Sequence, residues 1–136
     1  VTSRDTSSNV AFLKSATTTT EGKTAAFKSA TIGVGNARLG QTVIALGGKG
    51  RTSIADGIVT TIVSQASAGS SATAAIIETN ISGDVIMSGS VLLNTDGEVI
   101  GMSTITSRNI SAGAFISASA LIKQSITPKK TDTTSK

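Results

Sequence analysis

The segment Ile77–Gly101 contains Ser88, the residue on which any catalytic interpretation of this chain depends, followed directly by Gly89. A serine hydroxyl is a poor nucleophile until a neighbouring base takes its proton, and that base is usually a histidine. The 136 residues contain no histidine. The sequence therefore offers a candidate nucleophile for acyl transfer without the base that would activate it.

The other polar residues do not form a cofactor or metal site. Residues Gly35–Thr42 imitate a phosphate-binding loop, but Gln41 stands where such a loop needs lysine, and a strand is expected next where the loop needs a helix. The carboxylates are not spaced as the ligands of a calcium loop. Cysteine is absent, which excludes thiolate metal ligands and disulfides. We therefore expect no cofactor and no metal.

Charge and composition narrow the choice of partner. The net charge is +4 and the pI about 9.8, which suits either an acidic partner or the ordinary charge of a soluble surface. The only aromatic residues are three phenylalanines, and none lies among the lysines to stack on bases. We therefore expect no nucleic-acid partner. No apolar run is long enough to span a membrane, and the first residues do not resemble a signal peptide.

Short runs of aliphatic and β-branched residues predict an all-β domain. A strand is expected at 10–13, and six more at 42–46, 57–63, 74–79, 90–93, 98–104 and 113–117. Asp96-Gly97 supplies the positive φ of a hairpin turn between two of these strands. Residues 119–126 switch to helical spacing. Six short strands followed by a helix predict one small closed barrel.

Several segments, in order, resemble the C-terminal part of an HtrA-type serine protease, a trypsin-like enzyme of the chymotrypsin fold. They are Val1–Lys14, Leu39–Gly47, Gly57–Ser64, Leu93–Thr104 and Ala114–Ile122. The resemblance implies the second six-stranded barrel of that fold plus a short C-terminal helix. It also implies that the triad histidine belongs to a first barrel ahead of Val1.

The expected organisation follows from the same resemblance. Residues 1–16 would be the end of a first-barrel remnant, 17–31 a polar linker, 32–118 the second barrel, 119–127 the helix and 128–136 a polar tail. A chain that begins at Val1 would leave strand edges unpaired near Val10–Leu13, available to a partner strand.

The resemblance also assigns the site, position by position. Ser88 matches the nucleophile, and Asn9 stands at the triad aspartate. Ile86, Met87 and Ser88 occupy the oxyanion-hole positions, where Ile86 replaces a glycine. A β-branched residue resists the tight backbone conformation that suits glycine there. Asparagine in place of the aspartate would favour the wrong histidine tautomer. A lysine could serve as base in principle, but none sits at a matched position.

These departures predict a catalytically inactive trypsin-like homologue that acts as a structural or binding module outside the cytoplasm, in the cell envelope, at the surface or secreted. Its partner would be a protein or peptide, and a homo-oligomer could form by strand addition at the open edge. The alternative is a serine endopeptidase of HtrA type whose histidine lies in an upstream segment or on another chain.

Overall fold

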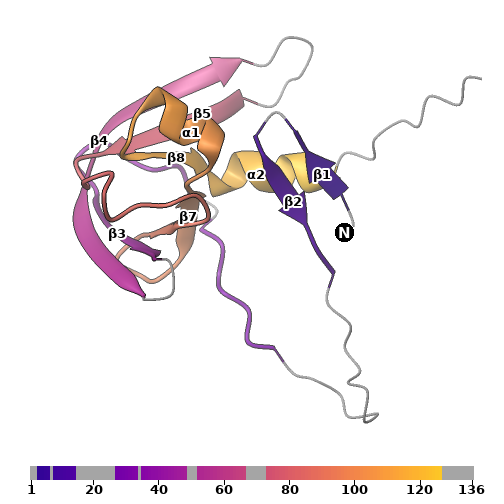
Figure 1. Cartoon of the computed structure of the whole chain (residues 1–136), viewed down its shortest axis with the longest axis horizontal. Coiled ribbons are helices and arrows are strands. Elements are labelled where there is room, and N and C mark those ends of the chain that lie inside the picture. Colours follow the sequence, from indigo (N-terminus) through magenta and orange to yellow (C-terminus); the bar gives the residue numbers. More distant parts are fainter. Residues whose placement is uncertain are drawn as a thin grey trace, which may run out of the picture.

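A computed structural model describes residues 3–6, 8–14, 27–33, 35–48, 52–66 and 73–126. These residues form eight strands and two helices (Figure 1). The strands are β1 (Ser3–Asp5), β2 (Val10–Phe12), β3 (Thr42–Gly47), β4 (Ser53–Ala66), β5 (Thr73–Thr79), β6 (Val91–Leu93), β7 (Val99–Met102) and β8 (Ala114–Ser117). The helices are α1 (Ile105–Ile110) and α2 (Ala118–Ile126).

Strands β3 to β8 close into a six-stranded barrel in the order β3-β4-β5-β8-β7-β6, and β6 pairs back to β3. Each neighbouring pair is antiparallel. The barrel confirms the predicted all-β class, and α2 confirms the short C-terminal helix. Closure matters because a closed sheet has no exposed edges of its own.

Side chains at alternating positions along the strands point into the barrel and fill its interior. In β3, Val43 and Ala45 are buried while their neighbours face outward. The central cluster is aliphatic except for Phe115, which has no exposed surface. Burying each large apolar side chain of this kind contributes about 1.5–3 kcal/mol. The small core agrees with the low aromatic content of the sequence.

Strand β8 is buried on both faces because a second apolar cluster covers the outside of the barrel there. Phe115 points into the barrel, whereas Ala114 and Ile116 point outward against Leu121 of α2 and Val10 of β2. Figure 1 shows α2 running from the barrel toward the β1–β2 hairpin. The second cluster therefore joins the β1–β2 hairpin to the continuous β8–α2 segment, which is distant from it in sequence.

The β1–β2 hairpin pairs residues 3–5 with 10–12, and strand β1 was not predicted. It pairs with one edge of β2, the strand whose edges we expected to be open. Within the described residues these two strands form a sheet of their own, so β2 has a strand neighbour on one side.

Strand β4 is longer than predicted. It runs from Ser53 to Ala66, whereas the sequence predicted residues 57–63. Gly57 was taken as a boundary, yet it pairs with Val43 inside the ladder. A Cβ at this position would collide with the side chains of Asn80 and Ile81. The glycine therefore allows a close approach and does not interrupt the strand. Helix α1 was also not predicted.

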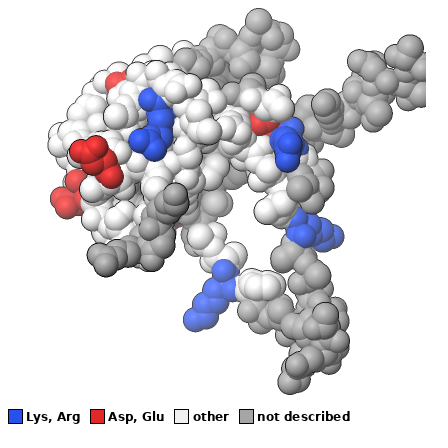
Figure 2. Space-filling view, in the orientation of Figure 1, with Lys and Arg blue, Asp and Glu red and all other residues white. Residues whose placement is uncertain are grey.

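Few of the described residues on the face shown in Figure 2 are charged. Among the described residues, no helix is long and apolar enough to cross a membrane. The described residues contain no group of three or more histidine, cysteine or carboxylate side chains that could hold a metal ion.

Candidate functional site

Ser88 lies on an exposed turn between the loop after β5 and the start of β6. The turn is held from behind by the residues that follow β7. The N–H of Gly89 donates to the carbonyl of Ser103 at 2.7 Å, and the N–H of Ser103 donates to the carbonyl of Ser90 at 2.8 Å. Gly89 has a φ of +94°, a conformation that other residues rarely adopt. The serine hydroxyl is therefore presented on a backbone that is fixed on its inner side.

The side chain of Ile86, two residues before the serine, is only 2% exposed and belongs to the barrel core. In the described residues, Asn9 is the only non-glycine position with a positive φ, so Ile86 has ordinary backbone geometry. The loop is thus anchored by an apolar side chain at the position where the resemblance expects a glycine.

The three expected oxyanion-hole positions differ in how their N–H groups are used. The N–H of Met87 donates to the hydroxyl of Ser90 at 3.0 Å. The N–H groups of Ile86 and Ser88 donate to no other described residue. An N–H beside Ser88 therefore remains available for an acceptor that comes from outside.

Ser88 borders a hollow of about 300 Å³ whose opposite wall is helix α1. Its lining residues are Ser88, Ile105, Arg108, Asn109 and Ala112. The wall combines an exposed apolar side chain, a guanidinium and an amide. Such a hollow offers donors and apolar contact but, within the described residues, no carboxylate.

Helix α1 is fixed by its first turn. The hydroxyl of Thr104 accepts from the N–H of Ser107 at 3.1 Å, and the hydroxyl of Ser107 accepts from the N–H of Thr104 at 2.9 Å. This reciprocal arrangement is a capping box. The hydroxyl of Ser107 also donates to the carbonyl of Ala114 at 2.9 Å, which ties the helix to β8.

Arg108 reaches from α1 back to the serine loop, where its Nη2 lies 3.5 Å from the carbonyl of Gly83. This is a long contact and uses one of the five N–H groups of the guanidinium. Arg108 forms no ion pair with any other described residue. The half-buried cation therefore has most of its donors available toward the hollow.

Asn9 lies elsewhere. It occupies the turn between β1 and β2, is exposed and has a φ of +55°, which asparagine tolerates better than most residues. It borders a separate hollow formed by residues of the hairpin. Ser88 and Asn9 thus line different hollows, and the local turn already accounts for an asparagine at position 9.

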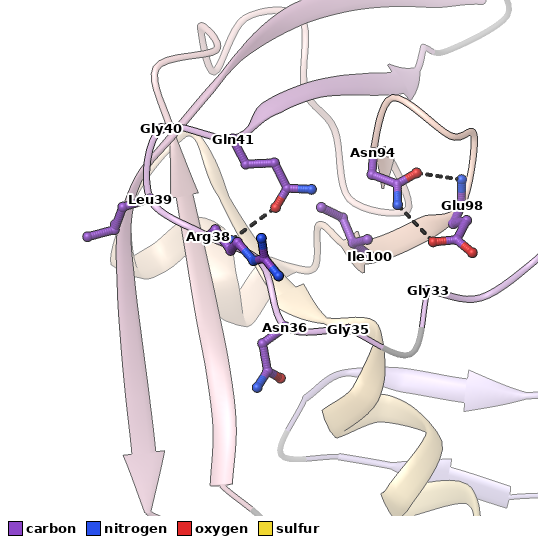
Figure 3. A pocket seen from close by; sticks show the side chains of 10 residues that line it. All are labelled: Gly33, Gly35, Asn36, Arg38, Leu39, Gly40, Gln41, Asn94, Glu98 and Ile100. Atoms are coloured by element: carbon purple, nitrogen blue, oxygen red, sulfur yellow. Dashed lines mark hydrogen bonds between the residues drawn. The ribbon is translucent and has the colours of Figure 1, made fainter.

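A larger hollow of about 460 Å³ lies between the segment that precedes β3 (residues 33 and 35–41, here called the crossing segment) and the β6–β7 turn (Figure 3). Three of its polar side chains, those of Asn94, Glu98 and Gln41, are held by local bonds. Asn94 Nδ2 donates to Glu98 Oε2 at 2.8 Å, and Gln41 Oε1 accepts from the N–H of Arg38 at 3.0 Å. The side chain of Leu39 points away from the hollow in Figure 3. These bonds fix the turn and the crossing segment, which gives the hollow a structural explanation.

The six-stranded barrel agrees with the family to which the chain is similar. The family described as "Trypsin-like peptidase domain" matches residues 1–102, so the chain belongs to this family. No curated protein matches the chain. The matched part includes Ser88 but ends at Met102, before α1. The wall of the hollow that carries Arg108 therefore lies outside the matched range.

Sequence reasoning missed Arg108, Ile105 and Asn109, since it did not predict the helix that carries them. The available signal was the pair Thr104 and Ser107, which has the spacing of a capping box. That signal was weak because the third helical position is usually Glu or Gln in this motif, and here it is serine.

Proposed function

We propose that the protein is a catalytically inactive homologue of the HtrA type that binds a protein or peptide at the Ser88 hollow. The observation that carries this proposal is the burial of Ile86. An oxyanion hole needs backbone N–H groups that point at the position of the developing oxyanion. Loss of one such donor typically costs about 100- to 1000-fold in rate. At position 86 the backbone direction is instead set by a side chain packed in the core.

One further observation supports a loss of catalysis. Asn9, at the triad aspartate position, borders a different hollow. On the ground of the resemblance we also propose that the protein acts outside the cytoplasm, in the cell envelope, at the surface or secreted.

A serine endopeptidase remains the second candidate, because Ser88 is exposed and its N–H has no acceptor among the described residues. In that case the base would come from an upstream segment or from another chain. The two candidates differ in the reactivity of one hydroxyl, so a probe for activated serines separates them.

The test is labelling with a fluorophosphonate probe, read by mass spectrometry of the intact chain and of its peptides. We expect no adduct on Ser88, and the same absence of signal in Ser88→Ala. An active trypsin in the same tube controls for the reagent. An adduct on Ser88 that disappears in Ser88→Ala would overturn the inactive assignment and favour the endopeptidase.

We further propose that the hairpin supports self-assembly by strand addition. Strand β2 has a strand neighbour on one side in the described part of the chain, and β1 is likewise a short strand of a two-stranded sheet. Unpaired strand edges are templates for another strand. Sedimentation velocity over a range of concentrations should show a reversible dimer or larger species. A strict monomer at the highest concentration contradicts this part of the proposal.

A further inference from the structure

We propose that the Ser88 hollow binds a peptide carboxylate and that Arg108 is the residue that selects it. The inference deepens the proposed binding function and rests on it for the location of the site. Arg108 is half-buried and forms no ion pair with a described residue. Its guanidinium lines the hollow, and the positive charge there attracts an anionic occupant.

The groups around the hollow suit a carboxylate. Arg108 offers the planar pair of donors that matches two carboxylate oxygens. Ser88 contributes a hydroxyl and Asn109 an amide, and both line the same hollow of about 300 Å³. The free N–H of Ser88 adds a donor without a partner among the described residues.

The apolar wall indicates that the carboxylate belongs to a peptide with an apolar side chain nearby. Ile105 is 54% exposed on helix α1, and Ala112, which follows this helix, also lines the hollow. A small inorganic anion would use the donors but leave Ile105 in water. A peptide that ends in an aliphatic residue would use both.

The carboxylate could be the C-terminal group of the peptide or the side chain of a glutamate. Both present the same two oxygens to Arg108, so the experiment separates them. The probes are three fluorescein-labelled hexapeptides measured by fluorescence polarisation against the full chain. They are Gly-Ser-Gly-Ser-Ala-Leu with a free C-terminus, the same peptide as its C-terminal amide, and amidated Gly-Ser-Gly-Glu-Ala-Leu.

The free-acid peptide should bind, and the Ser-containing amide should bind on the order of 10- to 100-fold more weakly, because it lacks the charge-assisted hydrogen bonds. If the glutamate-containing amide recovers the binding, the side chain is the source. Arg108→Gln should weaken binding of the free acid by a similar factor and reduce its salt dependence. Arg108→Lys should retain part of the affinity.

Arg38→Gln is the matched control, because Arg38 lines the separate hollow at the β6–β7 turn. It removes the same charge and should leave binding unchanged. Circular dichroism checks that each variant is folded. Equal binding of acid and amide, no binding of any peptide at up to about 1 mM, or an equal loss in Arg38→Gln and Arg108→Gln would each overturn the inference. Failure of the inactive assignment is seen separately, as an adduct on Ser88.

Discussion

Two serines at the start of α1 show how much a single hydroxyl depends on its partners. Ser103 and Ser107 both have no exposed surface. The hydroxyl of Ser107 bonds to Thr104 and Ala114, whereas the hydroxyl of Ser103 has no partner in the described part of the chain. A buried polar group without a partner is costly, and such groups are rare in folded proteins. Ser103 lies directly behind the Ser88 turn, where the backbone bonds of Gly89 and Ser90 hold it.

The two serines should therefore respond oppositely to alanine. Ser107→Ala should lower the free energy of unfolding by about 1–3 kcal/mol, because the N–H of Thr104 and the carbonyl of Ala114 lose their partner. Ser103→Ala should leave it unchanged or raise it by up to about 1 kcal/mol, because it removes only an unsatisfied group. Urea unfolding followed by circular dichroism measures both. A comparable loss in Ser103→Ala would mean that this hydroxyl has a partner beyond the described residues.

At the scale of elements, the β6–β7 turn and α1 show which features a sequence can predict. The turn was predicted from Asp96-Gly97, and Gly97 has the expected positive φ of +78°. Local chemistry was sufficient there, because Asn94 Oδ1 accepts from the N–H groups of Asp96 and Glu98 within the same turn. A turn closed by its own residues is visible in the sequence.

Helix α1 could not be predicted in the same way. Its six residues are far fewer than the roughly 12–15 that an isolated helix needs to be marginally stable in water. The helix depends on bonds to residues outside it, from Ser107 to β8 and from Arg108 to Gly83. Because Arg108 and Ile105 lie on this helix, the sequence did not predict that they line the candidate site. Ser88, in contrast, could be placed from the resemblance of its own segment.

At the scale of the whole molecule, the barrel could be predicted and its outer covering could not. Alternating apolar residues indicate that a strand has a buried face, and six such strands were enough to predict closure. Alternation does not say what lies on the other face. Strand β8 is buried on both sides because α2 and the β1–β2 hairpin meet over it. This contact joins the first described residues to the last.

Val10 is the buried hairpin residue in this contact, beside the partly buried Phe12, and it should hold the hairpin in place without supporting the barrel. Val10 is 8% exposed and packs with Ile116 and Leu121 in the second cluster. Val10→Ser removes most of that apolar contact and places a hydroxyl among aliphatic side chains. We expect hydrogen exchange to speed up in β1 and β2, while the amides of β3 and β6 keep their protection.

Ala11→Ser is the matched control, because Ala11 is the exposed neighbour on the same strand and receives the same hydroxyl. It should leave exchange unchanged throughout. If Val10→Ser instead lowers protection evenly across the barrel, hairpin and barrel unfold as one cooperative unit, and the second cluster is then part of a single core. If Val10→Ser changes nothing, the hairpin is held by contacts other than the one at Val10. The expected local loss would instead establish the hairpin as a separately opening unit, able to expose its strand edges while the Ser88 hollow stays intact.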